Sequence, residues 1–146
     1  MRVIALLVFA VVSSGCGIVW SPEGGEPLSP ADWATATCDV VIRVLVQPLA
    51  VEGGEALSRA LDGAVVDLDA VEPAEGAGRL HDRLTDEVEA MSGRIGELTS
   101  AGAAPSVIDA EWLLLREQAI ATLSDAVHDL PPDVRAAFDQ ACGDAL

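Results

Sequence analysis

The stretch from Leu80 to Leu98, LHDRLTDEVEAMSGRIGEL, decides the fold of this 146-residue chain. Its apolar residues recur at steps of four, four, three, four and three, and they are Leu80, Leu84, Val88, Met91, Ile95 and Leu98. An α-helix has 3.6 residues per turn, so these steps place the apolar side chains on one face. The pattern therefore predicts a long amphipathic helix that buries this face.

The same periodicity continues on both sides. It predicts a preceding helix that ends before Pro73, with the stripe Leu57, Leu61, Val65, Leu68 and Val71. It predicts a following helix with the stripe Ile108, Trp112, Leu115, Ala119, Leu123, Val127 and Leu130, and a short last helix with Val134, Phe138 and Ala141 inward. Because there is no internal repeat, we expect one all-α domain over residues 30–146, a small bundle of four to five helices.

The first helix of this bundle has a clear start. Ser29 suits the N-cap, Pro30 suits the first helical position, and Asp32 can reach back as a variant of the capping box. The helix is expected to run to about Gln47, because Pro48 interrupts it.

The second half of this helix has an alternative. Val40–Val46 is rich in β-branched residues and lacks a clean period, so a strand competes with a helix there. The spacing of Trp33, Val40 and Val44 favours a helix, as does the Asp39–Arg43 pair four residues apart.

The N-terminus has a different character. Arg2 precedes ten apolar residues, Val3–Val12, and the small residues Ser13, Ser14 and Gly15 then lead to Cys16. This layout is that of a secretory signal. With cysteine directly after the small residues, it resembles the lipobox of bacterial lipoproteins. The resemblance implies cleavage after Gly15, a lipid on Cys16, and a place on the outer face of the cell membrane.

The resemblance covers only residues 1–17, and Ser13 stands where leucine is typical. Two alternatives stay open. The uncharged run Val3–Trp20 could remain as a membrane-spanning helix, although it is short for that. Alternatively, an ordinary signal peptidase could cut nearby and release a soluble protein. On the lipoprotein interpretation, residues 1–15 are the cleaved signal peptide, and residues 16–29 hold the lipidated cysteine and a linker rich in Pro and Gly.

The cysteine count fits export. With Cys16 assigned to the lipid, Cys38 in the first helix and Cys142 in the last remain as a pair. In an oxidising compartment we expect them to form a disulfide, the alternative being two free buried thiols.

Composition limits the partners. From Cys16 onward, seven Arg face 24 Asp and Glu, a formal charge of −17. Such a surface repels nucleic acid phosphates and anionic lipid headgroups, so we expect no nucleic acid partner. Lys, Asn and Tyr are absent, which is typical of a GC-rich genome such as those of actinobacteria.

Candidate catalytic and metal-binding residues are few. Neither His81 nor His128 lies in a nucleophile motif. Asp125 and His128 have the i,i+3 spacing of two ligands on one helix face, and His81 has Asp82 beside it and Glu75 upstream.

The acidic stretch 67–72 lacks the glycine that a calcium loop needs at its sixth position. Solvated helix faces explain most of these acids, so we assign no metal or cofactor. The apolar run Trp112–Leu115 is interpreted as core, or, if part of it is exposed, as a partner surface.

Two hypotheses about function follow. The leading one is a non-catalytic envelope lipoprotein, held at the membrane through Cys16, whose helical domain binds a protein or a small ligand. The alternative is a metal-binding carrier or an enzyme that uses His81 and His128 with nearby carboxylates. The location of the two histidines in the fold discriminates between them.

Overall fold

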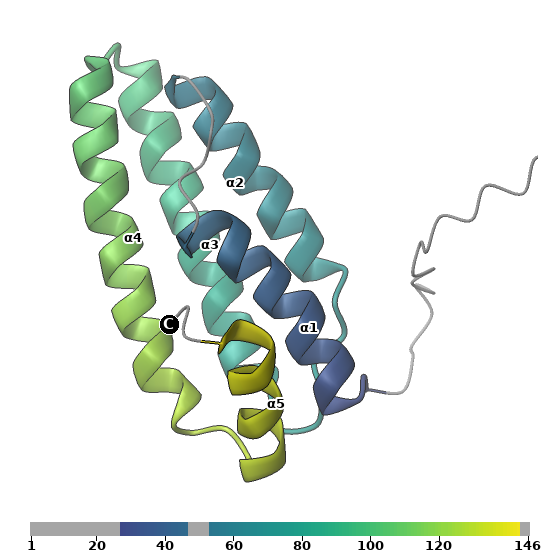
Figure 1. The fold of residues 1–146 in the computed structure, drawn as a ribbon. Helices are drawn as coiled ribbons and strands as arrows, with labels where there is room; N and C mark the ends of the chain where they lie inside the picture. The colour runs from purple at the N-terminus through teal and green to yellow at the C-terminus, as the bar shows by residue number, and fades with distance from the viewer. Residues whose placement is uncertain (1–26, 47–52, 144–146) are drawn as a thin grey trace, which may run out of the picture.

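The structure, a computed structural model, describes residues 27–46 and 53–143. They form five α-helices and no strand (Figure 1), so the predicted all-α class is confirmed. The helices are α1 (Pro30–Val41), α2 (Gly54–Asp69), α3 (Gly78–Ser100), α4 (Pro105–Val127) and α5 (Pro132–Cys142), and a π-helical segment, η1 (Ile42–Val46), continues α1. Residues 1–26, which include Cys16 and the predicted signal peptide, lie outside the described residues.

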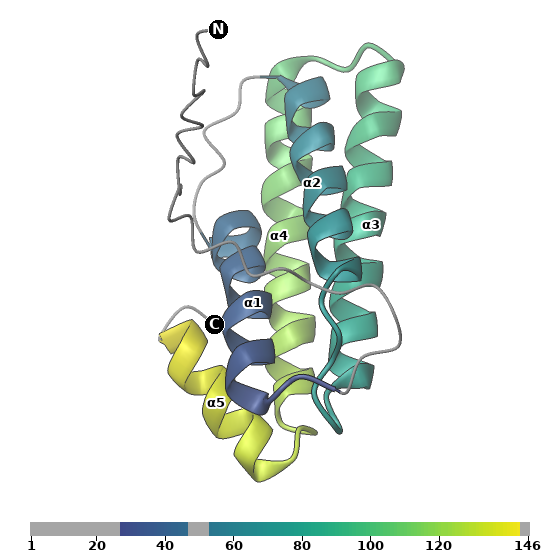
Figure 2. The same ribbon diagram turned by 90° about the vertical axis from the view of Figure 1, so that its right-hand side faces the viewer.

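The three longer helices run side by side, and the two shorter ones pair at one end of the bundle. α2 packs mainly on α3, α3 packs on α4, and α1 packs mainly on α5. Figure 1 shows α4 at one edge of the bundle, and Figures 1 and 2 both show α5 beside the first half of α1. The first and last helices of the chain are therefore neighbours.

The core follows the predicted stripes. All side chains of the Leu80–Leu98 stripe are buried except Leu98, which is partly buried. In α2, Ala64 lies in the core while Val65 is only partly buried. The fully enclosed large side chains are Trp33, Val41, Val44, Leu45, Leu61, Leu68, Leu84, Val88, Met91, Ile95, Leu123 and Val134.

The start of α1 is capped from within the predicted linker. The Ser29 hydroxyl accepts a hydrogen bond from the Asp32 backbone N–H at 3.2 Å and donates one to the Asp32 carboxylate at 2.6 Å. Leu28 packs against the core as well. The predicted capping-box variant is thus present, and contacts with the domain begin just before Pro30.

The ambiguous segment Val40–Val46 is helical, but its last five residues form the π-helix η1. Arg116 of α4 reaches the end of η1, where its guanidinium donates to the carbonyl oxygens of Leu45 and Val46. A helix leaves its last carbonyls without internal partners, and a cation suits this negative end of its dipole. Gln47, the predicted end of the helix, lies outside the described residues.

One predicted contact is wrong. Arg43 does not pair with Asp39 four residues earlier but with Asp67 on α2. The reason is tertiary: α2 packs against α1 and η1, and it offers a carboxylate that a pattern within one helix cannot reveal. Both partners are about half exposed, so this ion pair contributes little to stability.

A disulfide and an aromatic stack join α1 to α5. Cys38 and Cys142 form a disulfide with their Cα atoms 5.2 Å apart, which supports the predicted pairing. The rings of Trp33 and Phe138 stack beside it with centroids 5.7 Å apart. All four side chains are buried, so the cross-link lies inside the protein and joins the two ends of the domain.

Candidate functional site

The two candidate histidines lie in different environments. His81, in the first turns of α3, is buried with 7% of its surface exposed, and its Nδ1 has no hydrogen-bond partner among the described residues. His128 is the C-cap of α4 and is exposed, as are Asp125 and Glu75. The structure therefore does not gather these residues into one enclosed site.

The electrostatics of His81 follow from its burial. Desolvation lowers the pKa of its imidazole, because the charged form loses its hydration. The carboxylates of Asp82, Asp69 and Glu72 and the carbonyl of Leu68 act in the opposite direction but do not cancel this effect. His81 is thus best understood as a neutral ring in the contact between α2 and α3.

A metal site finds no support in the described part of the chain. Over residues 27–46 and 53–143, no group of three or more His, Cys, Asp or Glu side chains is placed to hold a metal ion. The Asp125–His128 pair lacks a third ligand, and the two cysteines that could contribute sulfur are joined to each other. The metal-binding alternative therefore gains nothing from the structure.

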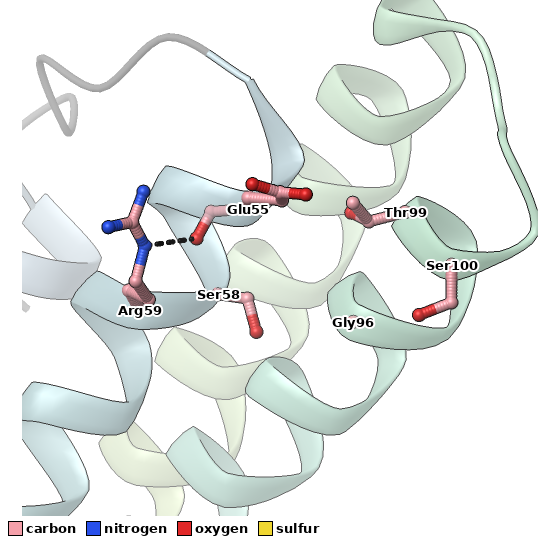
Figure 3. A pocket seen from close by; sticks show the side chains of 6 residues that line it. All are labelled: Glu55, Ser58, Arg59, Gly96, Thr99 and Ser100. Atoms are coloured by element: carbon pink, nitrogen blue, oxygen red, sulfur yellow. Dashed lines mark hydrogen bonds between the residues drawn. The ribbon is translucent and has the colours of Figure 1, made fainter.

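A shallow cleft of about 330 Å³ lies where α2 begins and α3 ends. The residues that line it, most of which have polar side chains, are Glu55, Ser58, Arg59, Gly96, Thr99 and Ser100 (Figure 3). Figure 3 shows the Arg59 guanidinium pointing away from the α3 hydroxyls, held by a hydrogen bond from its Nε to the Glu55 carbonyl at 3.2 Å. Its polar groups do not converge on one point, so the cleft does not define a ligand site.

A close approach of α2 and α3 shapes this end of the bundle. Gly54 lies against Thr99, whose side chain occupies the place where a Cβ on Gly54 would stand. Farther along the two helices, the buried Ser92 hydroxyl donates a hydrogen bond to the Asp62 carboxylate. The Ser58 hydroxyl lies 3.4 Å from the Ser92 hydroxyl. This polar row satisfies hydrogen-bonding groups between two helices, so we interpret it as a packing feature.

The clearest surface feature is on α4. Its inner face is buried through Ile108, Trp112, Ala119 and Leu123, yet Leu113 and Leu114 are 52% and 64% exposed. Five exposed residues at steps of three, four, four and three form what we call the outer stripe: Val107, Ala110, Leu114, Gln118 and Ala121. α4 therefore has an outer face of four apolar residues and one glutamine in addition to its buried inner face, and only the inner face packs on the bundle.

The outer stripe is uncharged although its helix is not. The four acidic residues of α4 are Asp109, Glu111, Glu117 and Asp125, and none of them lies on the stripe between Val107 and Ala121, although the exposed Asp125 follows one turn later on the same face. Glu111 accepts a hydrogen bond from Arg94 of α3 at 2.8 Å, and this bond raises the pKa of the Arg94 guanidinium. The ion pair neutralises one flank of the stripe.

Sequence reasoning identified part of this surface. The apolar run Trp112–Leu115 was expected to be core or, where exposed, a partner surface, and it divides between the two. Val107, Ala110 and Ala121 were not singled out. The signal that could have found them is a second apolar period on α4, offset from the first.

Comparisons with known proteins find no relative of this chain. No family model, no curated protein and no solved structure matches it. Within residues 27–46 and 53–143, no helix is long and apolar enough to cross a membrane. The function must therefore be inferred from the residues themselves.

Proposed function

We propose that this protein is an envelope lipoprotein, held at the membrane by a lipid on Cys16, and that its helical domain binds another protein through the outer stripe of α4. The observation that carries the proposal is the use of the three cysteines. Cys38 and Cys142 form a disulfide with each other. We assign the third cysteine, Cys16, to the lipid because it follows a signal-like segment.

The buried disulfide supports export. Disulfides persist in oxidising compartments and are rare in the cytosol, so a chain that joins its first and last helices in this way suits the outside of the cell. Two acyl chains on one cysteine anchor a protein durably, at about 0.8 kcal/mol for each buried methylene. An acidic domain cannot bind anionic headgroups, which makes a covalent lipid the fitting anchor.

The outer stripe supports a role in protein binding. Monomeric proteins seldom expose contiguous apolar surface without a reason, and such surface is typical of contact sites. The polar cleft and the two histidines offer no comparable arrangement of groups. A binding function therefore fits the described residues better than a catalytic one.

The anchor is tested by replacing Cys16 with Ala in the full chain and following the protein between membrane and soluble fractions. We expect the wild type in the membrane fraction and the C16A variant in the soluble fraction. Mass spectrometry should find the wild-type N-terminus at Cys16 with an added diacylglyceryl group.

The matched control replaces Cys38 and Cys142 with Ala, which removes two cysteines but should leave the protein in the membrane. Retention of C16A in the membrane would overturn the anchor and favour an uncleaved helix. A soluble wild type, cut at another residue, would favour ordinary secretion.

A further inference from the structure

We propose that the outer stripe of α4 binds the same stripe on a second copy of this chain, in an antiparallel helix pair about a two-fold axis at Leu114. The inference names the partner in the proposed function and rests on that proposal only for its membrane location. Three features of the stripe carry it: its charge, its symmetry and its size.

Charge decides where two copies can meet. Each chain has a formal charge of −16, so most approaches of one copy to another bring like charges together. The exposed residues of α2 include Glu55, Asp62, Asp67 and Asp69, and those of α3 include Asp82, Asp86, Glu89 and Glu97. The outer stripe lacks such groups from Val107 to Ala121, and the first carboxylate on the same face is the exposed Asp125, one turn beyond Ala121. It is thus the face of a long helix on which self-association meets the least repulsion.

The stripe is complementary to itself. Under a two-fold axis at Leu114, stripe residues equally far from position 114 face each other across the contact. Val107 then meets Ala121 of the second copy, Ala110 meets Gln118, and Leu114 meets Leu114. Each larger side chain faces a smaller one except at the axis, where two leucines pack together as they do in helix pairs.

The flanking carboxylates also fit this arrangement. In an antiparallel pair, each flank of a helix faces the same flank of its partner. Glu111, already paired with Arg94, then lies beside Gln118 of the second copy. Glu117, on the other flank, lies beside Ala110 and the exposed Leu113. Glu111 and Glu117 of the second copy lie at the same level but on opposite flanks, so they do not face each other directly.

The size of the stripe predicts a weak dimer. From Val107 to Ala121 it is about 21 Å long, at 1.5 Å per residue. One such helix pair is smaller than the interfaces of stable complexes, so dilute protein should be largely monomeric. An anchor that holds both copies on one membrane raises their effective concentration, which favours a contact that is too weak in solution.

Cysteine cross-linking in intact cells tests the inference with the full chain. At a two-fold axis, residue 114 of one chain lies next to residue 114 of the other. The Leu114→Cys variant should therefore give a disulfide-linked dimer on mild oxidation. Mass spectrometry of a tryptic digest should find the peptide 95–116 linked to itself. Val66→Cys on α2 is the matched control, because Val66 is 67% exposed but lies outside the stripe, and it should stay monomeric.

A second pair of variants tests the direction of the helices. Val107→Cys and Ala121→Cys should each stay monomeric alone but form a mixed dimer when the two are co-expressed. A parallel pair would instead link Val107→Cys to itself. Leu114→Glu, placed in the Val107→Cys and Ala121→Cys chains, should abolish the mixed dimer.

Several results would overturn the inference. They are a monomeric Leu114→Cys protein, an adduct of this variant with a different protein, equal cross-linking of Val66→Cys, and self-linking of Val107→Cys. Fractionation of the same samples separates this test from that of the anchor. Membrane-bound Leu114→Cys without a dimer would refute only the dimer, whereas a soluble protein that still forms the dimer would refute only the anchor.

Discussion

The pair α1–α5 and the helix α4 contain similar amounts of apolar sequence but use it differently. In α1 and α5 the apolar side chains turn toward each other and the core, and the disulfide and the Trp33–Phe138 stack close the contact. In α4 the inner face is equally buried, yet Leu113, Leu114 and Val107 remain exposed. The first region maintains the fold, and the second has apolar surface beyond what the fold requires.

The difference shows how to separate residues that stabilise from residues that bind. A buried apolar side chain contributes to folding through the area it loses to water. An exposed one contributes almost nothing to folding, and a row of them on one helix face is typical of a contact outside the chain. Equivalent substitutions in the two regions should therefore give effects of very different size.

The largest effect is expected from the disulfide. Replacing both Cys38 and Cys142 with Ala should lower the free energy of unfolding by about 4–5 kcal/mol, because the bond restricts a loop of about 100 residues in the unfolded chain. The sequence separation of the two cysteines is 104. Denaturant unfolding followed by circular dichroism measures this change.

Wild-type protein unfolded with and without a reductant provides the matched comparison, because it leaves every side chain in place. A loss below about 1 kcal/mol in both experiments would mean that packing alone holds α1 to α5. The comparison between the two regions would then lose its main support.

The second prediction compares two leucines on opposite faces of α4. Leu123→Ala should lower the free energy of unfolding by about 2–5 kcal/mol, because Leu123 is 1% exposed and its removal leaves a cavity. Leu114→Ala should change it by no more than about 0.5 kcal/mol. Both changes place Ala in the same helix, so helix propensity does not explain the difference.

Unfolding at low protein concentration, where the chain is monomeric, measures both values. A loss of several kcal/mol in Leu114→Ala would show that the outer stripe is covered within its own chain, and it would weaken the proposed binding role. Similar small losses in both variants would show that α4 contributes little to the core.

The sequence was sufficient for the elements whose apolar period is unambiguous. The stripes of α2 and α3 predicted which faces are buried, because one period fits each helix and no competing face exists. The pairing of Cys38 with Cys142 also followed, since assigning Cys16 to a lipid leaves two cysteines.

Where two patterns compete, the sequence could not decide. In α4 one set of apolar residues fits the inner face and another fits the outer stripe, and only packing against α3 selects between them. Val40–Val46 lacks a period, so its π-helical end, held by Arg116 from α4, could not be predicted. The ion pair of Arg43 with Asp67 likewise depends on a neighbouring helix.

The smallest expected effect is on the pH dependence of the free energy of unfolding, and it comes from the buried His81. Burial lowers the pKa of His81 in the folded protein, so its neutral form is favoured there while the unfolded chain keeps an ordinary value of about 6.5. As pH falls below about 6.5, the unfolded state takes up a proton that the folded state resists, and stability decreases until the pH passes the folded pKa. The free energy of unfolding should therefore fall more steeply between pH 7.5 and 5.5 in the wild type than in His81→Gln.

An NMR titration of the His81 ring in the intact protein tests directly whether its pKa is lowered. A titration midpoint at or above 6.5 would contradict the lowered pKa.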